Sequence, residues 1–459
     1  MATATMIKLP VSNTMVVSKN VKEDARATVD ELLRRNHLEN HIAWHQERRN
    51  NHVVHHMLSI YALGATSDQI REHYKRAISV VPPAHPIDAN LSQSLIDREK
   101  WKIHIGDHLY YHSYLAFFER EIEAKGYINV MLEYLFAEDE RAEDMLCRLF
   151  AGLLHPWIHL GFALEFQQPS LMAEALAQIA TIPTWNFEEI LLPAEKVAGD
   201  FGSKPLIEIM EDMRKDERVM AAPQWSNFNK LLDVIANVPD ALMKYASQFT
   251  VTEDQLDEKV AELMETSAYV FGATQRPGKV PRIEFLLMHC VTSNVFLSNV
   301  LYHPSISARA RVRMLEWKGR TDLIIWASCK CPRLYPARVM NYPVTKNWDA
   351  LIQWSLNHPD EDSHYIKTLR ALMQGQKVGR LCRDQGKKPK LMVSDMTWLQ
   401  VGNMLVAAGE GDPKYVRYAG FDEAWDGVQD ERSAAEEEGA VNAESASSTR
   451  AIERGMASL

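Results

Sequence analysis

Strict alternation of apolar and polar residues, the pattern of a half-buried β-strand, is nearly absent from this chain. Apolar residues recur instead at helical spacing, and Pro or Gly residues separate the segments. A first helical stretch is expected over 21–65, with a stop at Gly64 and a new N-cap at Thr66. Further helices are expected at 66–80, 107–122, 126–135, 139–152, 156–166, 170–180, 239–247, 253–272, 282–302, 307–328, 347–357 and 360–375. The pattern predicts an all-α protein of roughly fifteen helices in one or two lobes.

The two ends of the chain differ from this helical body. Residues 1–20 are expected to be a flexible arm, and residues 21–420 a globular all-α domain. From residue 421 the composition changes, and 429–459 is rich in Glu, Ala and Ser. Such a segment cannot bury enough apolar surface to order itself, so 421–459 is predicted to be a disordered acidic tail.

Charge and cysteine usage exclude several classes of protein. The formal net charge is −10, whereas a general nucleic-acid binder needs a strongly basic face. No apolar run reaches the ~18 residues that a membrane span needs, and the start of the chain lacks a secretory signal pattern. The 5 cysteines are irregularly spaced and are expected to be reduced thiols. We therefore expect a cytoplasmic protein with a small-molecule partner; the sequence leaves its oligomeric state open.

Several common catalytic motifs are missing. The chain has neither a Gly-x-Gly-x-x-Gly run after a strand nor a P-loop, which argues against a dinucleotide-binding domain and a conventional flavin monooxygenase. It also lacks the Gly-x-Ser-x-Gly elbow of serine hydrolases and the His-Glu-x-x-His motif of metalloproteases. Any chemistry is therefore expected to depend on the histidines.

Two pairs of histidines stand four residues apart in apolar, helix-like runs. His52 and His56 form one pair, and His155 and His159 form the other. Residues at this spacing share a helical face, and neutral imidazole is the commonest metal ligand in proteins. Pro156 favours the first turn of a helix, so His155 is expected just before the helix and His159 is the stronger candidate. The pairs predict one buried site suited to iron, copper or zinc.

Further histidines lie in other contexts. The 17 histidines include His289 in an apolar run and His364 beside acidic residues. A lone histidine on an apolar face is more often a hydrogen-bonded core residue than a ligand, and this alternative stays open for each. The row of His104, His108 and His112 is more typical of a polar or pocket-lining face.

Several segments resemble one family in the same order along the chain. They are Asn51-His52-x-x-His55-His56 with Tyr61-Ala62-Leu63-Gly64-Ala65, 148–161, 173–178, Met288-His289-x-Val291, 315–322 and 362–372. Over about residues 45–375 the chain resembles the questin oxidase-like family of fungal polyketide pathways. The resemblance makes 21–420 the catalytic domain.

The resemblance implies oxidative cleavage of a ring carbon–carbon bond in an anthraquinone such as emodin, questin or a chrysophanol-like compound. It is consistent with two chemistries: a dioxygenase that uses non-haem Fe²⁺ and O2, or an NADPH-dependent Baeyer–Villiger monooxygenase without metal. The missing nucleotide fingerprint favours the first, with NADPH left as a possible electron donor. A non-catalytic helical pigment-binding protein is the remaining alternative.

The resemblance also implies a ligand set of several histidines and one carboxylated lysine, whose carbamate is a hard anionic oxygen donor. The first choices for imidazole ligands are His56, His159, His289 and His364, with His52 and His155 in reserve. Two lysines are candidates for the carbamate. Lys367 shares a helical face with His364, whereas Lys377 follows the expected helix end near Gly375 and is slightly preferred. Trp157, Phe162, Tyr110 and Tyr111 are the aromatic residues expected to line a flat apolar substrate pocket.

Overall fold

The fold is all-α. The computed structural model describes residues 1–10, 16–19, 21–44, 49–359, 362–387, 389, 391 and 393–431. The strands among these residues form two short pairs: β1 (Ala43–Trp44) is antiparallel to β2 (Arg49–Asn50), and β3 (Ile283–Glu284) is parallel to β4 (Tyr415–Val416). The prediction of an all-α protein is therefore confirmed.

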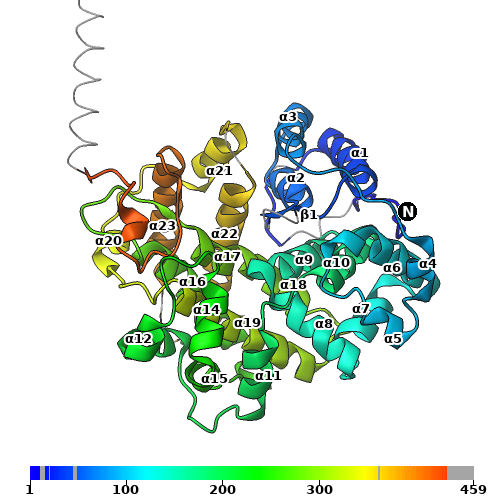
Figure 1. Cartoon of the computed structure of the whole chain (residues 1–459). Coiled ribbons are helices and arrows are strands. Elements are labelled where there is room, and N and C mark those ends of the chain that lie inside the picture. The colour runs from blue at the N-terminus through cyan, green and yellow to red at the C-terminus, as the bar shows by residue number, and fades with distance from the viewer. Residues whose placement is uncertain are drawn as a thin grey trace, which may run out of the picture.

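The first half of the chain forms one group of helices, coloured blue to cyan in Figure 1. Their bounds are α1 (Glu23–Glu39), α2 (Val53–Ala62), α3 (Ser67–Ile78), α4 (Ala89–Ser94), α5 (Arg98–Trp101), η1 (His108–Tyr110), α6 (Tyr111–Lys125), α7 (Tyr127–Leu135), α8 (Glu140–Phe150), η2 (Gly152–Leu154), α9 (His155–Glu165) and α10 (Pro169–Thr181). Helix α10 lies against both α9 and α6 and forms the middle of this group.

The second half forms the other group. Its helices are α11 (Glu188–Lys196), α12 (Leu206–Lys215), α13 (Glu217–Ala221), α14 (Lys230–Asn237), α15 (Pro239–Ala246), η3 (Glu253–Gln255), α16 (Leu256–Ala273), α17 (Phe285–Ser293), η4 (Asn294–Phe296), α18 (Leu297–Leu301), α19 (Ala308–Ser328), α20 (Pro336–Met340), α21 (Trp348–Asn357), α22 (His364–Asp384), α23 (Asp395–Gly409) and η5 (Glu423–Trp425). Helix α22 packs against α16, α17 and α23.

The two groups meet along four helices in the middle of Figure 1. Helices α2 and α9 of the first group each contact a helix of the second group, because α2 packs on α22 and α9 packs on α17. Most buried apolar residues form one continuous cluster from Ala4 to Ala408, and a small second cluster contains Val416, Trp425 and Val428. The interface between the groups is therefore part of a single core.

Local signals explain where some helices begin. Gly64 adopts φ +88°, and Thr66 then caps α3 through a reciprocal pair of hydrogen bonds with Gln69. This break and this N-cap were predicted. The expected continuous helix over 21–65 is wrong, because α1 ends at Glu39 and the β1–β2 pair separates it from α2. Helices α4, α5, α11–α14, α20 and α23 were not predicted. All of these except the 15-residue α23 are short segments between Pro and Gly residues, which resemble loops.

Both predicted chain ends need correction. Ile7 and Leu9 are buried, and the backbone N–H of Leu9 donates to Asp30 at 2.8 Å, so residues 1–10 are packed rather than a flexible arm. Trp425 and Val428 are also buried, so 421–431 belongs to the fold and not to a tail. Residues 432–459 of the predicted tail lie outside the described residues.

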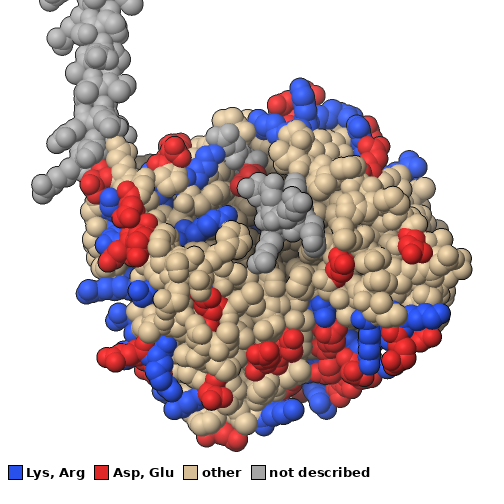
Figure 2. All heavy atoms as spheres, in the orientation of Figure 1, with Lys and Arg blue, Asp and Glu red and all other residues tan. Residues whose placement is uncertain are grey.

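The surface matches the expectation from charge. Figure 2 shows acidic and basic side chains interspersed over the visible face, with uncharged residues over much of its middle. Among the helices that the structure describes, none is both long and apolar enough to cross a membrane.

Candidate active site

A cluster of imidazoles, all buried except the half-buried His52, lies where α2, α9, α17 and α22 meet. The residue before α2 and the first turns of α2, α9 and α22 each contribute, and α17 contributes from its second turn. The members of this histidine cluster are His52, His55, His155, His159, His289 and His364. Lys367 stands one turn after His364 on the same helix and is buried with it.

Four of the rings form a closed circuit, here called the inner ring. The His155 ring centroid lies 5.0 Å from that of His52 and 5.0 Å from that of His289. The His364 ring closes the circuit, at 4.8 Å from His52 and 5.4 Å from His289. Four residues that are distant in sequence thus surround one point of the core.

The closest approach in the inner ring is between two nitrogens. Nε2 of His52 lies 2.8 Å from Nε2 of His155, and the two rings are nearly parallel. One such nitrogen can donate a hydrogen to the other in neutral imidazoles. Two nitrogens that each lie about 2.1 Å from one metal at right angles are also about 3 Å apart. The pair therefore suits either a hydrogen bond or a shared cation.

A left-handed turn places His155. Gly152, Leu153 and Leu154 have φ of +56°, +54° and +65° in succession, a costly backbone conformation for the two leucines. Gly152 is required, because a Cβ atom there would lie 2.2 Å from Cδ1 of Ile182. The turn brings the Gly152 carbonyl oxygen to 2.6 Å from Nδ1 of His155, which donates to it. Nε2 of His155 is then the nitrogen that faces the inner ring.

The inner-ring imidazoles of His289 and His364 also have Nδ1 beside an oxygen atom. Nδ1 of His289 donates to the Phe285 carbonyl oxygen at 2.7 Å, and Nδ1 of His364 lies 2.9 Å from Oδ1 of Asp362. Tyr415 in turn donates its hydroxyl to Asp362. Within the described residues, Nε2 of His289 and both nitrogens of His364 are buried without a hydrogen-bond partner, and Asp362 lies within ion-pair distance of Nδ1 of His364. Metal-binding histidines commonly show this arrangement, with one nitrogen held from outside and one left free.

His55 and His159 form a pair beside the inner ring. Their ring centroids are 5.3 Å apart, and the His55 ring also stacks on Phe162 at 5.3 Å. Nε2 of His159 lies 2.9 Å from Oε2 of the buried Glu174. In the described part of the chain, both nitrogens of His55 and Nδ1 of His159 have no hydrogen-bond partner.

Burial disfavours a positive charge on the imidazoles of His52, His55 and His155. It lowers the pKa of His52 and of His55 well below the usual value, and the positive charge of Lys367 lowers both further. The same two causes lower the pKa of His155 to about 3. Neutral imidazoles keep a lone pair, so the cluster offers several nitrogen donors at ordinary pH.

The chemistry of the donor set fits a transition metal, but the present positions of the donor nitrogens do not. Neutral imidazoles with held outer nitrogens suit iron, copper or zinc. In the ranges that the structure describes, however, no three His, Cys, Asp or Glu side chains are arranged to hold a metal ion as they stand. Binding would need small side-chain rotations that bring the free nitrogens together.

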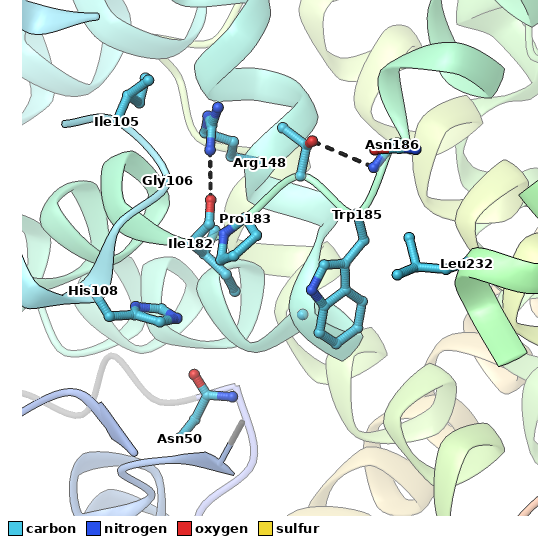
Figure 3. Close-up of a pocket in the computed structure, with 12 residues that line it drawn as sticks. Asn50, Ile105, Gly106, His108, Arg148, Ile182, Pro183, Trp185, Asn186 and Leu232 are labelled. Atoms are coloured by element: carbon cyan, nitrogen blue, oxygen red, sulfur yellow. Dashed lines mark hydrogen bonds between the residues drawn. The ribbon is translucent and has the colours of Figure 1, made fainter. Parts of the chain in front are cut away.

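A cavity of about 590 Å³ lies beside the turn that precedes His155, and Gly152 is part of its lining. Figure 3 shows its lining, in which Asn50, Arg148 and Trp185 surround an open space. Gly152 belongs to this wall and also holds His155 through its carbonyl oxygen, so the cavity and the cluster share one turn of backbone. The volume is within the range of about 300–1,000 Å³ for small-molecule sites.

The structure rearranges the predicted ligand set. His289 and His364 are in the inner ring, as the first choice had them. His52 and His155, the reserves, complete it, whereas the His56 ring packs on His73 instead. His52 and His56 were expected to share a helical face; in fact His52 is the N-cap, outside the helical turns.

The expected helix end near Gly375, on which the preference for Lys377 depended, is wrong. Helix α22 continues to Asp384 without a break at Gly375, so Lys377 points out of the helix into solvent and is exposed. Gly375 is needed for packing rather than for a turn, because a Cβ atom there would lie 2.4 Å from the Trp398 ring. Lys367 is the lysine that lies among the imidazoles.

Most of the aromatic residues predicted for the substrate pocket lie elsewhere. Trp157 is a core residue whose indole N–H donates to the Ser293 carbonyl oxygen. Tyr110 packs on His104, and Tyr111 packs on a separate group of histidines. Phe162 alone touches the histidine cluster, through its stack on His55. Helical apolar positions face the core, so their pattern does not distinguish packing from binding.

Two members of the site were missed as candidates. His55 lies one turn after His52, a spacing that also places side chains on one face. Glu174 stands in the apolar run of α10, and a carboxylate in such a run signals a buried partner.

Comparison with known proteins gives a consistent result. The family model described as questin oxidase-like matches residues 49–372, which include the whole histidine cluster. The chain is similar to the questin oxidase of Aspergillus fumigatus, with 31% identity over 445 residues that cover 93% of this chain and 99% of that protein.

Two further relatives carry other names. The Baeyer–Villiger monooxygenase dmxR6 of Cryptosporiopsis sp. is 34% identical over 439 residues, 92% of this chain and 98% of its own length. The oxidoreductase AflY of Aspergillus parasiticus is 35% identical over 412 residues, 87% of this chain and 82% of its own length.

Proposed function

Because the chain belongs to the questin oxidase-like family, we propose that this oxidoreductase cleaves a central-ring carbon–carbon bond of an anthraquinone with O2 at a non-haem iron. The relatives named questin oxidase and Baeyer–Villiger monooxygenase support an oxidative step in fungal secondary metabolism. The substrate would be a hydroxyanthraquinone of the emodin or questin type, in oxidised or reduced form.

The inner ring is the observation that carries the proposal. Four neutral imidazoles surround one point, and three of them have Nδ1 held from outside by Gly152, Phe285 or Asp362. Nε2 of His289 and Nε2 of His364 have no hydrogen-bond partner among the described residues. Leaving such nitrogens unpaired in a core costs free energy, so a ligand that uses their lone pairs is a better explanation than packing.

The metal would be held by His52, His155, His289 and His364, with Lys367 as the anionic ligand. Bound iron would supply the one-electron chemistry that lets dioxygen react with a closed-shell organic molecule. The protein's part is to orient the imidazoles from outside, to keep them neutral by burial and to exclude bulk water from the core.

Lys367 suits a carbamate. An ammonium group is costly among buried neutral imidazoles, and its charge already opposes their protonation. A neutral lysine amine adds to carbon dioxide and releases one proton, which gives a carbamate anion. The negative charge would then be balanced by the metal, and the hard oxygen would complement the imidazole nitrogens.

The cavity beside Gly152 is the proposed substrate site. Trp185 offers a flat apolar face, and Asn50 and Arg148 offer polar groups to hydroxyl or carbonyl oxygens at the edge of a tricyclic ring. The Asn50 amide oxygen is itself fixed by a hydrogen bond from Gln178 at 3.0 Å. A flat substrate here would lie one backbone turn from His155.

Metal content tests the proposal. Elemental analysis of the purified protein is expected to find about one iron per chain, as for a single closed site. His289→Ala and His364→Ala are expected to lose the iron. His56→Ala, an equally buried histidine outside the inner ring, is the matched control and is expected to keep it. Stoichiometric turnover by metal-free protein would refute the iron centre.

A second candidate is an NADPH-dependent Baeyer–Villiger oxidase without metal. The relatives named Baeyer–Villiger monooxygenase and Baeyer–Villiger oxidase favour it. Labelled dioxygen separates the two. Incorporation of both oxygen atoms into the opened product supports the dioxygenase, whereas one labelled atom with matching NADPH consumption supports the monooxygenase. Retention of pigment without turnover would support a binding protein instead.

A further inference from the structure

A hydrogen-bonded chain connects the histidine cluster to the surface through four different helices. Nε2 of His159 on α9 lies 2.9 Å from Oε2 of Glu174 on α10, and Oε1 of Glu174 lies 2.6 Å from Nδ1 of His37 on α1. Nε2 of His37 lies 2.9 Å from Oε1 of Glu119 on α6. The side chain of Glu119 is 20% exposed and ends the chain at the surface.

This chain is a poor way to stabilise a core. The side chains of His37, Glu174 and His159 are 1–3% exposed, so each polar group has lost its hydration. Apolar residues of similar volume often stabilise a protein at least as well as such buried pairs. A stability role alone therefore does not explain why four helices converge on these groups.

The donors and acceptors along the chain have one consistent assignment. Burial opposes a charge on His37, but hydrogen bonds to Glu119 and Glu174 outweigh it and raise the pKa of His37 to about 10. Both nitrogens of His37 then carry hydrogen and donate. Burial also acts to raise the pKa of Glu174, but hydrogen bonds from His159 and His37 hold it at about 2. Glu174 is therefore a carboxylate that accepts at both oxygens.

This assignment decides the tautomer of His159. If Oε2 of Glu174 only accepts, Nε2 of His159 must carry the hydrogen, and in a neutral His159 ring Nδ1 then carries the lone pair. Nδ1 is buried and has no hydrogen-bond partner among the described residues. The His159 ring meets the His55 ring at 5.3 Å, so this buried nitrogen lies in a ring that borders the cluster.

We propose that Glu174, fixed by His37, is a positioning residue that locks His159 in the Nε2–H tautomer and so presents the Nδ1 lone pair to the histidine cluster. The lone pair can accept a hydrogen bond from a phenolic hydroxyl of the substrate or bind the metal. The catalytic meaning of this role rests on the proposed function, whereas the tautomer itself does not.

Glu174→Gln is the decisive variant, because it keeps the shape of the side chain and reverses one hydrogen bond. The amide oxygen still accepts from His37, so the amide nitrogen must donate toward Nε2 of His159. His159 is then expected to switch to the Nδ1–H tautomer. Nitrogen-15 NMR of histidine-labelled protein, treated with a chelator and free of substrate, reads the tautomer directly; a His159→Gln spectrum assigns the signals.

Activity gives the second readout. Glu174→Gln is expected to lower kcat about 10–100-fold with little change in KM, the usual effect of losing an outer-shell partner. Glu119→Gln is the matched control, because an amide oxygen there still accepts from His37 and the tautomer of His159 should stay unchanged. Glu316→Gln, which also removes a buried carboxylate but far from the cluster, is expected to keep kcat.

Three results would overturn the proposal. The first is an Nδ1–H tautomer of His159 in the unmodified protein, which needs no variant to fold. The second is an unchanged tautomer in Glu174→Gln. The third is an equal loss of kcat in Glu316→Gln, which would show that any buried charge matters. Because the tautomer is read without turnover, a failure of the proposed oxygenase reaction would leave the first two tests valid.

Discussion

Adding one methyl group at Gly161 should disturb the histidine cluster through a chain of aromatic rings. Gly161 lies inside α9. It follows both histidines that this helix contributes and precedes the C-terminal end of the helix. A Cβ atom there would lie 2.1 Å from Cγ of Phe296. Phe296 packs on Phe162 with ring centroids 4.6 Å apart, and Phe162 stacks on His55.

The size of the effect follows from this distance. Carbon atoms in contact lie about 3.5–4.0 Å apart, so the Phe296 ring must move by about 1.5 Å. Overpacking a filled core at this severity costs about 3 kcal/mol, and replacing Gly with Ala inside a helix returns about 1 kcal/mol. We expect Gly161→Ala to lower the free energy of unfolding by about 2 kcal/mol and to displace the His55 ring.

Gly319→Ala is the matched control. Gly319 also lies inside a helix, and a Cβ atom there would lie 2.3 Å from the Phe249 ring. The Phe249 ring lies beside the Lys259 ammonium, which is 5.3 Å from its centroid, and not beside the cluster. The two variants should therefore lose similar stability in urea unfolding followed by circular dichroism, whereas kcat should fall about 10–100-fold in Gly161→Ala alone, since small misplacements of reacting groups are costly.

Two outcomes would refute this reasoning. If both variants lose kcat to the same extent, general loosening of the core and not the ring chain controls activity. If Gly161→Ala unfolds at the same urea concentration as the unmodified protein, Phe296 has room to move and the packing argument fails.

Three further predictions concern buried charges. Asp322→Asn should lower the free energy of unfolding in urea by about 3–5 kcal/mol, because the Lys318 ammonium loses a partner at 2.6 Å and both side chains are 0–1% exposed. The double variant Lys318→Met with Asp322→Leu should be nearly neutral, and a loss of stability equal to that of Asp322→Asn would contradict this reasoning. Burial raises the pKa of Glu284 from 4.5 to about 7. Its contribution to stability is therefore complete below pH 4.5 and falls by up to about 3 kcal/mol as the pH rises to 7. Glu284→Gln should remove this pH dependence of the free energy of unfolding, and a slope that persists would show that another group causes it. Lys367→Ala should lose iron whereas the exposed Lys377→Ala should keep it, and the reverse result would restore Lys377 as the ligand.

The sequence by itself determined the class of fold. Helical periodicity without strand alternation predicted an all-α protein, and local chemistry predicted the Gly64 stop and the Thr66 N-cap. These features depend on residues within one turn of each other, so a linear reading contains the needed information. The short helices between 182 and 238 were missed, because their stability comes from packing on the rest of the core and not from their own pattern.

The sequence also indicated which residue types matter, but not which of them meet. Of the histidines preferred as ligands, His289 and His364 lie in the inner ring, whereas His56, which was placed ahead of His52, lies outside it. The spacing of four residues defines a helical face, but whether a residue belongs to the helix is decided at its end. His52 is the N-cap of α2, and only packing against α9 and α22 turns its ring toward His155 and His364.

Only the tertiary structure decided the arrangement of the site. The ring of imidazoles joins residues 52, 155, 289 and 364, and the chain behind His159 joins residues 37, 119 and 174. The left-handed turn before His155 and the unbroken α22 around Gly375 likewise depend on Ile182 and Trp398, which come from other elements. Contacts between residues so far apart depend on how whole helices pack, and no local pattern in the sequence records that packing.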